Sequence, residues 1–326
     1  MAAARTTVII PTCNRAAYLC EAVASVLAQT LPADEILVID DGEGAAEALH
    51  AAFGAAPTLT VLRTPRPPLD KAGRGAGPAR NIGLARARGD FVAFLDDDDL
   101  WKPEKLARQV TLFAGRPKLG LVACGYDIID ENGQPRRGGA PVHDGFLKPR
   151  LNGPALRAML HRNQVTTSTV VARRECFADG GPSALLGVTL SSSKGGFDDR
   201  YPVAQDWDMW LRIAPRWEFC RRPDRLVRYR VHAGRNSARV HDMRACEVRL
   251  LEAARSRLDG LDPWTALLLR RRLGWARGRL GRSWLRRGEP TEARREILRS
   301  LREFPFDPRI WAILLASSVT APRPAA

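Results

Sequence analysis

Short runs of β-branched and other apolar residues alternate with helical stretches over about the first 115 residues of this chain. The apolar runs lie at 6–11 (TTVIIP), 34–42 (DEILVIDDG), 58–63 (TLTVLR) and 90–96 (DFVAFLD). Uninterrupted runs of this length are typical of strands that are buried on both faces, as in parallel sheets. Parallel strands need long, usually helical crossovers, so the alternation predicts an α/β fold with a mostly parallel sheet flanked by helices.

Three of the predicted strands end in polar residues. These ends read IIPTCNR (9–15), VIDDG (38–42) and FLDDDD (94–99). In α/β sheets, ligands bind beyond the carboxyl ends of the strands, and parallel strands bring those ends to one edge. The sequence therefore predicts a binding site at this edge.

Four consecutive carboxylates, Asp96 to Asp99, follow the strand at 90–96. A solvated turn that caps the next helix, expected from residue 102, needs one of them, and we assign that role to Asp99. The remaining like charges repel one another unless a cation neutralises them. Mg²⁺ or Mn²⁺ is commonly held by one or two carboxylates together with substrate phosphates. The cluster thus favours a metal–phosphate site over a capping turn alone.

Two well-known phosphate-binding motifs are missing from the sequence. It contains no G-x-x-x-x-G-K-[ST], and no G-x-G-x-x-G follows the first strand. The stretch 11–15 (PTCNR) still places Thr12, Asn14 and Arg15 between a strand and a helix, where backbone N–H groups favour an anion. A P-loop and a dinucleotide-binding fingerprint are therefore excluded, but an anion site is not.

Composition narrows the class of protein further. The 326 residues are 45% hydrophobic and 27% charged, with a formal net charge of +15. No signal-peptide pattern begins the chain, and no apolar run approaches the roughly 20 residues of a membrane span. The six cysteines show no metal-ligand spacing. We therefore expect a cytoplasmic protein with reduced thiols.

Five segments, in this order, resemble the nucleotide-sugar-dependent glycosyltransferases of family 2, which have the GT-A fold. They are VIIPTCNRAAYLCEAVASVLAQT (8–30), EILVIDDG (35–42), GPARNIGLARARGDFVAFLDDDDLWKPEKL (77–106), GGFDDRYPVAQDWDMWLRIA (195–214) and YRVHAGRNS (229–237). The resemblance covers about residues 5 to 240. It implies a GT-A catalytic domain at 1–240 and a basic helical extension at 241–326.

The resemblance also implies roles on the donor side. Asp41 would contact the nucleotide base, and its neighbours there would be Pro11, Thr12, Asn14 and Arg15. Asp96 and Asp97 would lie near the ribose and diphosphate. Asp98 would be the main metal ligand, with Asp96 as the second. Donor-site support would come from Arg80 and Asn81, and the diphosphate or metal would be approached late in the site by His232, Arg235 and Asn236.

On the acceptor side, the resemblance makes Asp206 in QDWDMW the catalytic base. Gln205 stands where the family usually has Glu, which removes a negative neighbour and predicts that Asp206 stays ionised more readily. Asp208 is the fallback candidate for the base. An ordinary pair of solvated acids at a helix start is the alternative for both residues.

The resemblance implies a single inverting displacement from a nucleotide-diphosphate sugar, with a UDP-sugar expected, assisted by Mn²⁺ or Mg²⁺. The acceptor would be a glycan or lipid-linked hydroxyl in polysaccharide, lipopolysaccharide or other glycoconjugate synthesis. One alternative is a nucleotidyltransferase, although PTCNRAAYL (11–19) lacks the glycine-rich loop expected after its first strand. A catalytically silent nucleotide-sugar-binding protein is the other. No aromatic–basic interleaving supports nucleic-acid binding.

From about residue 238 the pattern is helical. Residues 245–326 hold 17 Arg and no Lys against 9 acidic residues. Such helices suit peripheral contact with the anionic inner face of a membrane. A solvated helical cap on the catalytic domain is the alternative.

Overall fold

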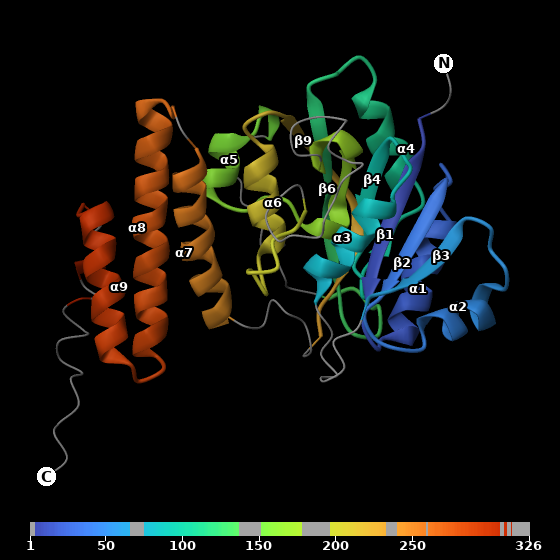
Figure 1. Ribbon diagram of the computed structural model, residues 1–326, viewed down its shortest axis with the longest axis horizontal. Coiled ribbons are helices and arrows are strands. Elements are labelled where there is room, and N and C mark those ends of the chain that lie inside the picture. The colour runs from blue at the N-terminus through green and yellow to red at the C-terminus, as the bar shows by residue number, and fades with distance from the viewer. Residues whose placement is uncertain are drawn as a thin grey trace, which may run out of the picture. The chain divides into compact units, whose positions relative to one another are not determined.

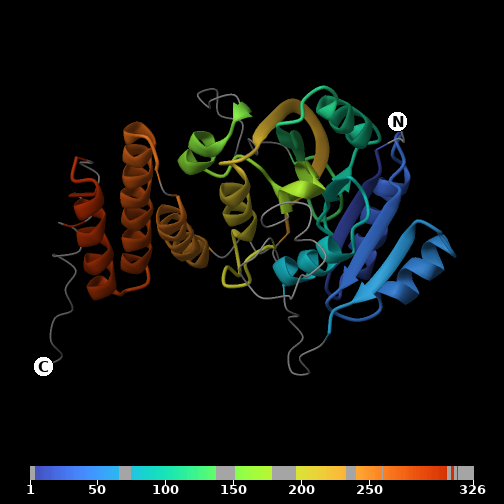
Figure 2. The ribbon, with the colours of Figure 1, turned by 45° about the horizontal axis from the view of Figure 1, so that its top comes forward.

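The computed structural model describes residues 4–65, 75–136, 151–177, 196–232, 240–258, 260–306, 310, 311 and 314. Arg235 and Asn236 lie outside the described residues. The chain divides into two compact units, the first made of residues 1–156 and 163–233 and the second of residues 157–162 and 234–326. The inclusion of 157–162 in the second unit had no signal in the sequence. Figures 1 and 2 show the elements of each unit.

Four parallel strands form one half of the sheet in the first unit. In spatial order they are β3 (Leu59–Arg63), β2 (Glu35–Asp40), β1 (Thr6–Thr12) and β4 (Phe91–Phe94). The crossovers contain α1 (Ala16–Leu27), α2 (Ala45–Phe53) and α3 (Ala76–Arg86). Every residue of β1, β2 and β4 is buried, as their uninterrupted apolar sequences predict. The predicted βαβ arrangement is confirmed (Figure 1).

The other half of the sheet mixes parallel and antiparallel pairs. Beyond β4 come β8 (Val170–Arg173), β6 (Leu119–Ile129), β9 (Glu218–Arg230) and β5 (Leu100–Trp101), and β7 (Asn152–Pro154) also pairs with β9. β6 and β9 are parallel, whereas β8 is antiparallel to both β4 and β6. Helix α4 (Lys105–Val110) comes directly after β5 in the chain, and helix α6 (Gln205–Ile213) comes directly before β9.

Successive strand residues cover opposite faces of the sheet, and helices cover both faces. Val8 belongs to an apolar core that includes buried residues of α1, α2 and α4. Its neighbour Ile9 faces the other way, where a Cβ on Gly83 of α3 would lie only 2.5 Å from the Ile9 Cγ2. Glycine thus lets α3 pack closely on this face. Phe94, opposite Ile9 in the register, lies 6.5 Å from the ring of Trp210 in α6.

The prediction that Asp99 caps a helix is wrong. Leu100 and Trp101 form β5, which pairs antiparallel with β9, and α4 begins only at Lys105. Asp99 is fully buried, and its Oδ1 accepts a hydrogen bond of 2.9 Å from the backbone N–H of Arg230. The local sequence does not reveal this, because the partner strand lies more than a hundred residues away.

Among the described residues of the second unit are the long helices α7 (Val240–Arg257), α8 (Pro263–Leu285) and α9 (Pro290–Glu303). Asp262 caps α8, since its carboxylate accepts from the N–H groups of Trp264 and Thr265, and Pro263 occupies the first turn. Buried arginines of α8 pair with acids of the neighbouring helices, as Arg272 does with Glu247. In the described part of the chain, no helix combines the length and apolar character that membrane crossing requires.

Candidate active site

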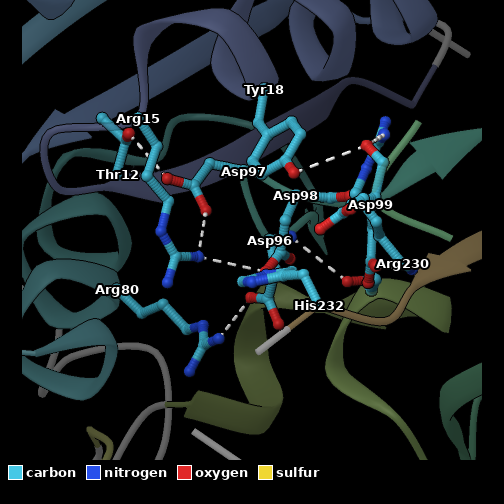
Figure 3. Close-up of polar contacts among 12 residues, drawn as sticks. Thr12, Arg15, Tyr18, Arg80, Asp96, Asp97, Asp98, Asp99, Arg230 and His232 are labelled. Carbon is cyan, nitrogen blue, oxygen red and sulfur yellow. Dashed lines mark hydrogen bonds and ion pairs between the residues drawn. The ribbon is translucent and has the colours of Figure 1, made fainter. Parts of the chain in front are cut away.

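The carboxyl ends of β1 and β4 meet through a side-chain hydrogen bond. Thr12, the last residue of β1, donates its hydroxyl to Asp97 Oδ2 at 2.8 Å. Arg15, which follows in the β1–α1 loop, lies with Nη1 3.4 Å from Asp97 Oδ1 and 3.0 Å from Asp98 Oδ2 (Figure 3). These strand ends bring Thr12 and Arg15 together with the aspartate cluster, as their places on parallel strands imply.

The four aspartates point to four different sets of partners (Figure 3). Asp96 forms an ion pair with Arg80 of α3. Asp97 turns to Thr12 and Arg15, and Asp98 to Arg15 and His232. Asp99 is turned into the protein toward the backbone of Arg230.

Burial and mutual repulsion shift the protonation of this cluster. Burial, and then the adjacent Asp98 carboxylate, raise the pKa of Asp97 to about 6, although the hydrogen bond from Thr12 and the charge of Arg15 oppose the shift. Burial and Asp98 also raise the pKa of the Asp99 carboxyl well above its usual range. A bound cation would relieve the same repulsion.

A divalent cation fits the pair Asp98 and His232 chemically. His232 Nε2 lies 2.9 Å from Asp98 Oδ2, so a carboxylate oxygen and an imidazole nitrogen that could both bind a cation are close together. No group of three or more His, Cys, Asp or Glu side chains in the described ranges could hold a metal ion. Diphosphate oxygens would therefore have to complete the coordination, which is the usual arrangement for Mg²⁺. Asp96, predicted as the second ligand, faces Arg80 in this structure.

Asp41, which was predicted to contact the nucleotide base, bridges two parts of the chain. Its carboxylate accepts from the hydroxyl of Thr64 at 2.7 Å and from the N–H of Gly75 at 2.8 Å. Residues 66–74, between these two partners, lie outside the described part of the chain. Asp41 therefore contacts the chain on both sides of this range, at Thr64 and at Gly75.

Asn14 holds the β1–α1 loop against the loop that follows β2. Its backbone is left-handed, with φ of 56°, and its Oδ1 accepts from the N–H of Glu43 at 3.0 Å. A Cβ on Gly42 would come within 2.4 Å of that oxygen, so glycine is needed here for close approach. Pro11, one residue before the end of β1, pairs with Ile39 of β2. In this structure Asn14 and Pro11 serve to join the two strand ends.

Asp206 lies in the first turn of α6 and is partly buried. Its Oδ1 accepts from the N–H of Trp207 at 2.7 Å, and its Oδ2 accepts from Asn163 Nδ2 at 3.2 Å and from Thr167 Oγ1 at 3.4 Å. Burial raises the pKa of Asp206, opposed mainly by the hydrogen bond from Trp207 and the positive charge of Arg80. The prediction that Asp206 stays ionised more readily was based only on the acidic neighbour that Gln205 replaces. Burial acts in the opposite direction and was not predicted.

The fallback residue Asp208 is in a different environment. It is buried, and its Oδ2 accepts from Nε of Arg212 at 2.9 Å. Arg212 also donates to the carbonyl of Gly196. Asp208 is thus engaged in an ion pair with Arg212, whereas no ion pair of Asp206 is seen among the described residues.

Several residues at this site were not predicted from the sequence. Arg230 and Tyr18 flank the aspartate cluster, and Asn163 and Thr167 contact Asp206. The strand-like stretch RLVRYRVH (225–232) contains three arginines, and no feature of the sequence distinguishes Arg230 from the other two. Nothing local in the sequence marks Asn163 or Thr167. Asn81, predicted as donor-site support, instead exchanges two hydrogen bonds with the backbone of Phe197.

Solved structures share this architecture. Staphylococcus aureus TarS 1–349 in complex with UDP-GlcNAc matches 97% of this chain and 88% of that one, with a TM-score of 0.66 and 16% identity. The Pyrobaculum calidifontis mannosyltransferase PcManGT, in complex with GDP-Man and Mn²⁺, matches 97% and 86%, with a TM-score of 0.57 and 21% identity. At this identity the likeness concerns the fold, and it confirms the predicted GT-A fold with additional C-terminal helices.

Curated relatives are also glycosyltransferases by description. An uncharacterized glycosyltransferase of Rickettsia felis is 30% identical over 64% of this chain and 31% of its own length. One of Nostoc is 41% identical over 38% and 37%. A putative teichuronic acid biosynthesis glycosyltransferase of Bacillus subtilis, TuaG, is 33% identical over 48% and 62%. The chain thus spans about a third of the length of the first two relatives.

The family model described as glycosyl transferase family 2 matches residues 7–173. That range contains the polar ends of β1, β2 and β4, together with Arg80 and all four aspartates. Because the match extends over more than half of the 326 residues, and the fold and the curated relatives agree with it, this chain belongs to glycosyl transferase family 2.

Proposed function

We propose that this protein transfers a sugar from a nucleotide-diphosphate sugar to an acceptor hydroxyl, with inversion at the anomeric carbon. The observation that carries the proposal is the place of Arg80. Its guanidinium pairs with Asp96 of the aspartate cluster, and its positive charge partly opposes the rise that burial causes in the pKa of Asp206. Arg80 therefore interacts with both Asp96, which would face the leaving diphosphate, and Asp206, which would accept a proton.

On the donor side, Asp41 would contact the base, with Pro11, Thr12, Asn14 and Arg15 shaping the loop around the nucleotide. Asp96, Asp97 and Arg80 would face the ribose and diphosphate. Asp98 and His232 would hold Mn²⁺ or Mg²⁺, which when bound would neutralise charge on the diphosphate. The UDP-GlcNAc and GDP-Man/Mn²⁺ complexes of the structural neighbours support a nucleotide-sugar donor and a divalent metal.

On the acceptor side, Asp206 would accept the proton of the attacking hydroxyl. Its raised pKa makes the carboxylate a stronger base than an exposed aspartate, which suits this task. The three hydrogen bonds from Trp207, Asn163 and Thr167 hold the carboxylate in one orientation. Arg80 and Arg15 would stabilise the negative charge that develops on the departing diphosphate.

The description of the Bacillus subtilis relative supports an acceptor in polysaccharide synthesis, such as a glycan or a lipid-linked saccharide.

We further propose a cytoplasmic protein whose C-terminal helices contact an anionic membrane surface. Trp264 and Phe306 are 74% and 81% exposed in this arginine-rich unit, and such aromatic side chains suit the headgroup region. Loss of binding to anionic vesicles in the double variant Trp264→Ser/Phe306→Ser would support this contact, and unchanged binding would oppose it.

A screen of nucleotide sugars tests the function. The protein should gain thermal stability with a nucleotide sugar only when Mn²⁺ or Mg²⁺ is present, and it should release nucleoside diphosphate from that donor. Pyrophosphate release from a nucleoside triphosphate and sugar phosphate would indicate a nucleotidyltransferase instead. Tight donor binding without turnover on any acceptor would indicate a silent binding protein. No stabilisation by any nucleotide would contradict the donor site itself.

A further inference from the structure

Arg230 ends β9 with a side chain that is buried although it is charged. Only 2% of the residue is exposed. Nε donates to the backbone carbonyl of Asp98 at 2.8 Å, Nη1 to that of Glu131 at 2.7 Å, and Nη2 to the carboxylate of Glu21 at 2.6 Å. The guanidinium also lies over the ring of Tyr18, 4.6 Å from its centroid (Figure 3). One side chain therefore joins α1, the aspartate cluster and the end of β6.

The same strand end holds the aspartate cluster in two more ways. The backbone N–H of Arg230 donates to Asp99 Oδ1 at 2.9 Å. Two residues further on, His232 Nε2 lies 2.9 Å from Asp98 Oδ2. Asp98 is thus held from its main chain by Arg230, while its carboxylate meets His232.

Stability alone does not explain an arginine at this place. A buried charge loses its hydration, and well-packed apolar residues often stabilise a protein equally well or better. The guanidinium, however, donates in three fixed directions at once, which neither an apolar side chain nor a lysine can reproduce. Its bond to the Asp98 carbonyl fixes the peptide from which the Asp98 carboxylate projects.

We propose that Arg230 is a positioning residue for the metal–diphosphate site, which sets the direction of the Asp98 carboxylate relative to His232. The inference rests on the proposed function of that site. Residues that orient ligands without touching the metal typically change metal affinity 10–100-fold when they are replaced. Arg230 would act in this way on Asp98 through the hydrogen bond to the Asp98 main-chain carbonyl.

The test compares wild type, Arg230→Lys and Arg230→Met with a matched control, Arg173→Lys. Arg173 makes the same kinds of contact outside the site: it donates to the carbonyls of Leu119, Phe113 and Arg116 and lies over the ring of Phe91. Mn²⁺ binding in the presence of UDP or GDP is followed by loss of the free Mn²⁺ electron paramagnetic resonance signal. Thermal unfolding in EDTA reports on the fold.

Arg230→Lys should raise the Mn²⁺ dissociation constant about 10–100-fold, and Arg230→Met at least as much. Arg173→Lys should lower the melting temperature without this change. Wild-type Mn²⁺ affinity in a folded Arg230→Lys protein would overturn the proposal. If neither Arg230 variant folds, Glu21→Ala, which removes the hydrogen-bond acceptor of Nη2 at the partly exposed end, should weaken Mn²⁺ binding, and unchanged binding would overturn the proposal. Failure of wild type to bind Mn²⁺ with any nucleoside diphosphate would instead overturn the proposed function.

Discussion

Asp98 and His232 lie 134 positions apart in the chain, yet His232 Nε2 is 2.9 Å from Asp98 Oδ2. The contact exists because β9 pairs antiparallel with β5, which directly follows the aspartate cluster. Two side chains able to bind a divalent cation thereby meet at the carboxyl edge of the parallel half-sheet.

Asp98→Asn should remove the stabilisation that Mn²⁺ and a nucleoside diphosphate give to the protein. In EDTA the melting temperature should change little, because the lost repulsion of Asp97 and Asp99 offsets the lost ion pair with Arg15. Differential scanning fluorimetry with and without Mn²⁺ and UDP or GDP measures both effects. Asp224→Asn, at a surface ion pair with Arg108, is the control that should keep the metal response. A full metal response in Asp98→Asn would contradict the assignment.

Asp206→Asn should lower kcat/KM for sugar transfer by about 10²–10⁴-fold, the usual contribution of a general base. Nucleotide binding should change little, since Asp206 is assigned to the acceptor side. Isothermal titration calorimetry and a transfer assay separate the two quantities. Asp208→Asn should act differently and mainly lower stability, because it breaks the ion pair between the buried Asp208 and the partly buried Arg212. Equal loss of donor binding in Asp206→Asn would place this residue on the donor side.

The activity should fall at low pH as Asp206 becomes protonated. Because burial raises the pKa of this carboxyl, the acid limb of kcat/KM should lie above the ordinary aspartate value of about 3.9. The Asn163 amide donates to the carboxylate and so favours its ionised form. Asn163→Ala should therefore move the acid limb to higher pH, which a pH–rate profile measures. A limb that stays in place would show that Asn163 does not tune the base.

Lys105 should make stability depend on pH in the alkaline range. It is fully buried beside the ring of Trp101, and burial lowers its pKa to about 8. The unfolded chain, with a lysine pKa near 10.4, binds more protons between about pH 8 and pH 10.4, so wild-type stability should rise across this window. Lys105→Met should be more stable than wild type by about 1–3 kcal/mol at pH 7, and the difference should vanish near pH 10.4.

Urea unfolding of both proteins at several pH values measures this difference directly. Lys102→Met removes a lysine from the partly exposed ion pair with Asp127, and it serves as the control. It should change stability by less than about 1 kcal/mol throughout. A stability gap between wild type and Lys105→Met that is independent of pH would contradict the buried-charge explanation.

The sequence alone determined the parallel half of the sheet and the edge where the site lies. Runs such as TTVIIP and EILVID are buried on both faces, and the helices between them dictate the crossovers, so Thr12 and Asp97 had to end at one edge. The resemblance of the motifs was enough to place the chain in its family. These are properties of local pattern, because hydrophobic periodicity and the handedness of βαβ crossovers act over short stretches.

The tertiary structure alone decided how the four aspartates divide their partners. From the neighbouring residues, Asp99 was predicted to cap a helix, but the pairing of β5 with β9 buries it against Arg230. The same pairing brings His232 to Asp98. Burial likewise raised the pKa of Asp206, whereas the prediction from the sequence considered only the acidic neighbour that Gln205 replaces. Strand register between distant segments and the loss of hydration on burial depend on the whole fold, and no short stretch of sequence encodes them.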